Sequence, residues 1–148
     1  MLTNISRQGR ILCSPRDPQG EAAVWLKRFE TATKAVNEIW VLGLGAGYHV
    51  KEVRNAFPQV KTRVLEFDRQ LILTSAWIHE DAALDVIHLE HPAEVLKHPQ
   101  FEKIAKNDVA ILSFRPAWQG LEQQFMELFL LLNARNVKGF RQQLQIQG

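Results

Sequence analysis

The sequence predicts an α/β fold, a Rossmann-like three-layer sandwich around a mostly parallel sheet. Apolar runs recur along the chain with helical segments between them, and continuous apolar runs are typical of parallel strands buried on both faces. The first main run, IWVLGLGAGYH, breaks into Gly43, Gly45 and Gly47 before a helical segment, as expected where a strand turns sharply into a helix. Right-handed crossovers then give a sheet of about four strands in the order 3-2-1-4.

Residues 1–20 are expected to form an N-terminal extension or a small hairpin, because ISRQGRILCS places Gly9 between two short strand-like stretches. A helix should follow from about Glu21 and end near Asn37. Its apolar positions recur at helical spacing: Ala22, Trp25, Leu26 and Phe29.

The main strands follow from the apolar runs and the helices from the segments between them. Strands are expected over residues 38–43, 60–67, 84–89 and 108–114, and helices over 48–57, 69–79, 92–98 and 101–107. A long helical segment should occupy 117–147, where Gly139 favours a break. The whole chain, 1–148, is expected to be one domain.

The glycine turn and the acids after the second strand predict a nucleoside site. Glycines let a ligand approach the backbone, and an acid at the tip of the next strand can bind ribose hydroxyls. Glu66 and Asp68 stand at that tip. Two alternatives remain open: a tight turn without a ligand, and a solvated strand end at Glu66. Asp68 is better interpreted as the N-cap of the helix that begins at Arg69.

Bulk composition excludes several classes of function. A formal charge of +2 without a basic stripe gives no support for nucleic-acid binding. No apolar run approaches the roughly 20 residues of a bilayer span, and no apolar signal region begins the sequence, so a cytoplasmic protein is expected. Cys13 is the one cysteine, which rules out an internal disulfide.

With these residues placed, the chain resembles the nucleotide-binding half of class I S-adenosylmethionine-dependent methyltransferases. It is more similar to the N-terminal Rossmann-like domain of motility accessory factor and spore-maturation glycosyltransferase-like proteins. Three stretches carry that similarity: P-x-x-E-A at 18–22, G-x-G-x-G-Y-H at 43–49 and V-x-E-x-D at 64–68.

The resemblance implies an S-adenosylmethionine site. Gly43, Gly45 and Gly47 would bound the methionine and ribose portion, with Tyr48 beside them, and Glu66 would take the ribose hydroxyls. The acid that the family places near the adenine amine would fall near Glu90 or His91 here, displaced from the family's position. An acceptor substrate would meet Arg115 and Trp118, in the position of the family's Asn- or Asp-Pro-Pro-aromatic motif.

Departures from the methyltransferase pattern limit the predicted activity. Val41 stands where an acid often binds the methionine amine, and the guanidinium of Arg115 cannot accept a hydrogen bond from a substrate amine. The printed sequence also stops one helix after the fourth strand. We therefore expect a nucleoside-binding module without a complete catalytic apparatus. The alternatives are a small methyltransferase completed by dimerisation and a ligand-free structural or interaction domain.

Several side chains keep two interpretations. Arg115 could bind a phosphate or carboxylate, or could pair with Glu90 or another acid. Trp77 and Trp118 could stack on a base or belong to the core. His49 lacks an identifiable partner acid for general-base work.

The remaining expectations concern metals and partners. No histidine pair has strong metal-ligand spacing, so no metal site is predicted. The last helix carries LFLLL at 128–132, apolar around most of its circumference. Such a helix is buried, so a homodimer or a docking domain is expected to cover part of it.

Overall fold

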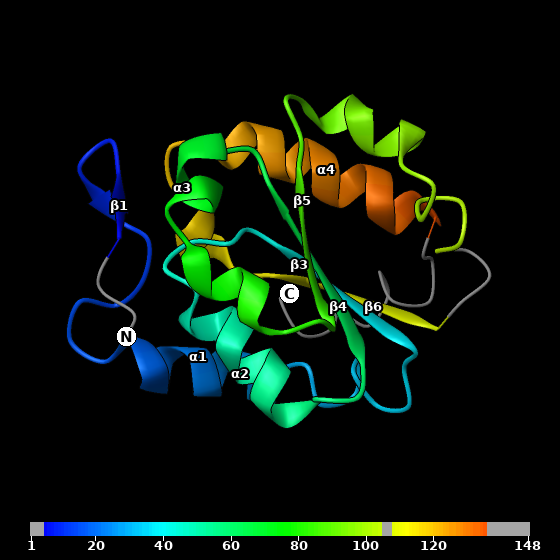
Figure 1. The fold of residues 1–148 in the computed structure, drawn as a ribbon, viewed down its shortest axis with the longest axis horizontal. Helices are drawn as coiled ribbons and strands as arrows, with labels where there is room; N and C mark the ends of the chain where they lie inside the picture. The colour runs from blue at the N-terminus through cyan, green and yellow to red at the C-terminus, as the bar shows by residue number, and fades with distance from the viewer. Residues whose placement is uncertain (1–4, 105–107, 136–148) are drawn as a thin grey trace.

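The computed structural model describes residues 5–104 and 108–135 and contains the expected parallel sheet (Figure 1). Its strands are β3 (Glu38–Leu42), β4 (Lys61–Glu66), β5 (Leu84–His88) and β6 (Val109–Ser113). They pair in parallel in the order β5-β4-β3-β6. This order is the third, second, first and fourth main strand along the chain, so the predicted α/β class and strand order are confirmed.

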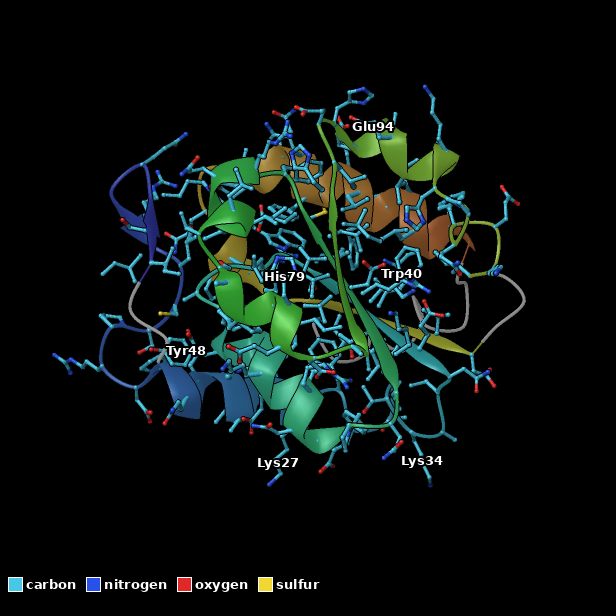
Figure 2. All side chains as sticks on the ribbon, in the orientation of Figure 1. Lys27, Lys34, Trp40, Tyr48, His79 and Glu94 are labelled. Atoms are coloured by element: carbon cyan, nitrogen blue, oxygen red, sulfur yellow. The ribbon has the colours of Figure 1, made fainter. Side chains whose placement is uncertain are left out.

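Helices cover both faces of the sheet. On one side, α1 (Pro18–Lys27) packs against α2 (Tyr48–Ala56), and on the other, α4 (Glu122–Arg135) packs against the 3₁₀ helix η2 (Pro92–Lys97). Lys27 on α1 and Glu94 on η2 accordingly lie on opposite sides of the molecule (Figure 2). The layers are therefore helix, sheet and helix.

The N-terminal hairpin is present. β1 (Ser6–Arg7) and β2 (Arg10–Ile11) pair antiparallel. Gln8 and Gly9 between them both have positive φ, 52° and 77°, as a type I′ hairpin turn requires. The hairpin stands apart from the main sheet and joins it through side chains.

The prediction that the first helix runs from Glu21 to Asn37 was wrong at both ends. α1 begins at Pro18 because the Asp17 side chain accepts from the Gly20 N–H as an N-cap. It ends at Lys27, where the N–H groups of Arg28 and Phe29 bond three residues back rather than four. Turns then lead to β3.

The predicted helix over 69–79 is two short helices, α3 (Arg69–Leu73) and η1 (Ala76–Glu80). The chain leaves helical geometry at Ser75, whose φ and ψ are −102° and 68°. The hydroxyls of Thr74 and Ser75 donate back to the carbonyls of Gln70 and Leu71, a bond that bends helices and slightly destabilises them.

The predicted helical segment over 117–147 is also divided. η3 (Arg115–Trp118) follows β6 directly, and Gly120, with φ of 88°, separates it from α4. Gly139 lies outside the described residues. So does the end of the predicted 101–107 helix, whose described part, 101–104, forms turns.

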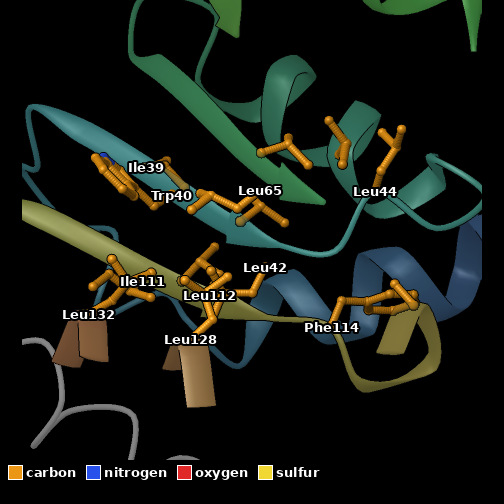
Figure 3. Packing of buried hydrophobic residues seen from close by; sticks show 14 of the residues in the cluster. Ile39, Trp40, Leu42, Leu44, Leu65, Ile111, Leu112, Phe114, Leu128 and Leu132 are labelled. Atoms are coloured by element: carbon orange, nitrogen blue, oxygen red, sulfur yellow. The ribbon is translucent and has the colours of Figure 1, made fainter. Parts of the chain in front are cut away.

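The core joins both helical layers to the sheet. Leu128 and Leu132 of α4 pack beneath Ile111 and Leu112 of β6 (Figure 3), and all four are at most 1 % exposed. Across the described residues, no helix is both long and apolar enough to cross a bilayer.

Candidate functional site

The predicted site lies at the carboxyl edge of the sheet, where ligands bind in open α/β folds. Gly43, Gly45 and Gly47 link β3 to α2 with φ values of +105°, +50° and +92°. Gly47 is the N-cap residue of α2. All three conformations are ones that residues with a side chain rarely adopt, so the turn depends on glycine.

Side chains of the same chain fill the space in front of these glycines. A Cβ atom added to Gly43 or to Gly45 would lie 2.8 Å from the Ala117 Cβ of η3. A Cβ added to Gly47 would overlap the ring of Trp77 in η1. The glycines therefore allow η3 and η1, rather than a ligand, to pack closely against the backbone of the turn.

Glu66 ends β4 at the predicted position, and its carboxylate is fully engaged inside the protein. Oε1 accepts from the Leu44 N–H at 2.9 Å, and Oε2 accepts from the N–H groups of Phe67 and Asp68 at 2.9 and 3.0 Å. Glu66 is 0 % exposed. Burial raises the pKa of Glu66, opposed by the Arg7 guanidinium and the three amides.

Arg7 of the hairpin completes this cluster. Its Nη2 donates to Glu66 Oε2 at 3.3 Å and its Nε to Asp68 at 3.2 Å. Nη1 donates to the carbonyls of Ala117 and Gln119, at 3.1 and 2.9 Å. One guanidinium thus joins the hairpin, the end of β4 and η3, and it lies against the oxygens predicted to bind ribose.

Asp68 is the predicted helix cap: its Oδ1 accepts from the Leu71 N–H at the start of α3. The sequence did not reveal Arg7. An arginine in a polar hairpin is an ordinary surface residue, and only the fold brings it to an acid 59 positions away.

Tyr48 and His49 open α2 beside the turn, as predicted. Tyr48 is half-buried and labelled in Figure 2, while His49 is 1 % exposed. His49 Nε2 donates to the Gly43 carbonyl at 2.7 Å. Its ring stacks on Phe114 at 4.0 Å between centroids and meets Trp25 edge-on. This environment encloses the imidazole, so the geometry favours a packing role over general-base catalysis.

Burial lowers the pKa of His49 to about 4, although the Gly43 carbonyl opposes the shift. Because that carbonyl can only accept, Nε2 carries the proton of the neutral ring. Nδ1 is then a buried acceptor, and it has no hydrogen-bond partner.

Trp118 belongs to the core. It is 1 % exposed, its Nε1 donates to the Leu42 carbonyl at 2.8 Å, and its ring stacks on Phe125. The enclosed indole favours the core interpretation of Trp118, and its contact with an acceptor substrate stays a prediction without support from this geometry. Trp77 is half-buried over Gly47, with the Lys51 ammonium 5.1 Å from its ring centroid.

Arg115 and Glu90 follow strands at opposite edges of the sheet, β6 and β5. The alternative that pairs them is wrong for this reason. Glu90 is exposed, with its carboxylate 3.8 Å from His88. Arg115 is exposed and its guanidinium lies 4.7 Å from the Trp118 ring centroid.

An open groove of about 870 Å³ lies beside Arg115. One face of α1 forms one wall, and residues 113–116 at the end of β6 form the other. The sequence offered no signal for it, since the groove exists only where α1 passes the end of β6.

The histidines do not gather into a metal site. Within residues 5–104 and 108–135, no three His, Cys, Asp or Glu side chains form a group that could hold a metal ion. Cys13 is buried, and burial raises the pKa of its thiol.

No protein-family model matches the chain, and comparisons with curated proteins and with solved structures found no significant match.

Proposed function

We propose that this chain is a non-catalytic binding module with a Rossmann-like fold, whose glycine turn supports the fold rather than a nucleoside cofactor. The Glu66 carboxylate carries the exclusion of the cofactor, because three backbone amides and Arg7 already occupy its oxygens. Ala117 and Trp77 fill the space in front of the glycines. The residues present therefore do not fit S-adenosylmethionine in this conformation. The open groove beside α1 supports the binding role.

A methyltransferase completed by dimerisation has less support. The acceptor contact assigned to Trp118 requires an accessible indole, and this ring is in the core. A cytoplasmic location is part of the proposal, supported by a single cysteine that leaves no internal disulfide.

Isothermal titration of the full chain with S-adenosylmethionine and S-adenosylhomocysteine tests the proposal. We expect no binding by either ligand up to millimolar concentration. Micromolar binding that the Glu66→Ala variant weakens would contradict it, since the loss of charged hydrogen bonds to ribose would then be measured directly.

The second candidate is a nucleoside-binding module that opens when the hairpin lifts from the sheet. Three glycines with positive φ ahead of α2, and an acid at the tip of β4, favour it. Arg7→Met removes the guanidinium from the Glu66 oxygens, and Trp77→Ala removes the ring over Gly47.

Thermal melts of both variants with and without S-adenosylmethionine separate the two candidates. A ligand at about 100 times its Kd stabilises a folded protein by about 2.7 kcal/mol. If the turn is purely structural, the ligand leaves Tm unchanged in both variants. A ligand-dependent rise in either one would support the opening site. Trp77→Ala keeps the test available if Arg7→Met does not fold.

A further inference from the structure

The groove beside α1 is large enough for a small molecule and is lined along one side by a face of that helix. Its volume of about 870 Å³ lies within the range of known ligand pockets. Its lining includes Glu21 and Val24 of α1, with Asp17 and Arg28, the N-cap and C-cap residues of that helix, and these four recur every three or four positions. Such residues share one helix face, so the groove runs along the length of α1.

The position of the groove follows from the strand order. β6 and β4 lie on either side of β3, so the switch point of the sheet is between β3 and β6. Ligands in open α/β sheets bind beyond the carboxyl ends of strands at that point. Ala117 and Trp118 fill the crevice over the glycine turn, and the groove is the opening on the α1 side of the same edge.

Three packed aromatic side chains, Trp25, Phe29 and Phe114, line the floor of the groove and are 7 %, 2 % and 2 % exposed. Trp25 meets Phe29 and Phe114 edge-on, with centroid distances of 5.5 and 5.4 Å. The Trp25 Nε1 donates to the Ser113 carbonyl at 2.8 Å, which fixes the indole. Val24 adds a 60 % exposed apolar side chain at the wall. A ligand would meet a preformed surface, which lowers the entropy cost of binding.

The acidic side chains along the groove have hydrogen-bond partners within the protein, whereas the two arginine side chains have none among the residues that the structure describes. Asp17 caps α1, and Glu21 Oε1 accepts from the Ser14 N–H at 2.6 Å. Arg28 and Arg115 are both exposed, and neither guanidinium has an ion pair or hydrogen bond within the described part of the chain. Arg115 lies over the Trp118 ring, which leaves its planar fork of N–H groups for an oxyanion.

We propose that this groove binds a small organic oxyanion, a carboxylate or a phosphate monoester with an apolar body. Arg115 holds the anionic group, and the body packs on Val24 and the accessible edges of the aromatic floor. The inference rests on the proposed binding role of the chain. It does not depend on the glycine turn, so the titrations with S-adenosylmethionine neither support nor overturn it.

Isothermal titration of the full chain with phenyl phosphate, benzoate and phenol is the test. We expect the two anions to bind and phenol to bind at least tenfold more weakly. The stronger of the two anions identifies phosphate or carboxylate as the preferred group. Arg115→Gln should weaken anion binding about tenfold or more, because a charged hydrogen-bonded contact is lost.

Two further variants make the test specific. Arg69→Gln removes an exposed arginine of α3 that does not line the groove, and it should leave the affinity unchanged. Glu21→Gln keeps an oxygen for the Ser14 N–H but removes a negative charge, so it should strengthen anion binding. Absence of anion binding at 10 mM, equal binding of phenol, or an Arg115→Gln affinity equal to that of Arg69→Gln would each overturn the proposal.

Discussion

At the scale of single residues, Glu66 fixes the geometry of three segments at once. Its two oxygens hold the amide after Gly43, the two amides after β4, and the Arg7 guanidinium. Removing one partner of a buried ion pair typically costs about 3–5 kcal/mol, whereas an apolar replacement of both can be neutral. The intact Arg7–Glu66 pair therefore adds little net stability over an apolar pair, and its main effect is to fix the position of the hairpin.

His49 is the second residue whose environment has a measurable consequence. Its pKa of about 4 in the folded chain compares with 6.5 for an unperturbed histidine, and burial is the main cause. The unfolded chain thus binds more protons than the folded chain between pH 6.5 and pH 4. Stability must fall as the pH falls through this window.

We predict that His49→Gln flattens the dependence of stability on pH. At 1.36 kcal/mol per pKa unit, wild-type protein should lose about 3 kcal/mol through His49 between pH 7 and pH 4. Glutamine can still donate to the Gly43 carbonyl but does not titrate. Urea unfolding at several pH values measures the difference, with His91→Gln at an exposed position as the control. Parallel profiles for wild type and His49→Gln would contradict the prediction.

At the scale of elements, the decisive contact is η3 against the glycine turn. Ala117 lies where a side chain on Gly43 or Gly45 would have to go. Arg7 holds the same short helix through the carbonyls of Ala117 and Gln119. The hairpin, η3 and the turn therefore form one packed unit over the carboxyl edge of the sheet.

Alanine substitutions at two glycines test this packing. Gly9→Ala in the hairpin has φ of +77° and no atom within 4 Å of the added Cβ, so it should cost only the backbone strain of about 1–2 kcal/mol. Gly45→Ala adds a clash with Ala117 at 2.8 Å, and we expect about 1–3 kcal/mol more.

Denaturant unfolding of both variants, of Ala117→Gly, and of Gly45→Ala combined with Ala117→Gly measures the coupling. The second substitution should recover part of the loss, as contacting residues do in double-mutant cycles. If Gly45→Ala costs no more than Gly9→Ala, η3 does not pack on the turn in solution, and the site over the glycines is open.

At the scale of the whole molecule, the parts that were predictable are those that local signals determine. The apolar runs placed all four main strands, and Asp68 before a helical segment placed its cap. The site is closed by the contact between Arg7 and Glu66, which lie 59 positions apart in the sequence. No local sequence pattern predicts a contact at that separation. Trp118 was ambiguous because an aromatic residue beside a pocket suits both a ligand and a core.

The apolar helix α4 could be buried in the core of its own chain or in an interface between two copies. Phe125, Leu128 and Leu132 are 0 % exposed against the protein's own sheet and η2, whereas Leu130 is 54 % exposed. The structure thus accounts within one chain for most of the apolar surface that suggested a homodimer.

We predict that Leu128→Ala lowers the free energy of unfolding by about 2–5 kcal/mol, as expected for a cavity in a packed core. Leu130→Lys should change it by about 0.5 kcal/mol or less. In a homodimer built on α4, Tm would rise with protein concentration, and Leu130→Lys would lower the molecular mass in solution. Melts over a hundredfold concentration range and sedimentation equilibrium of the wild type and Leu130→Lys measure both. A concentration-independent Tm, with equal masses, would show that α4 stabilises the chain from within.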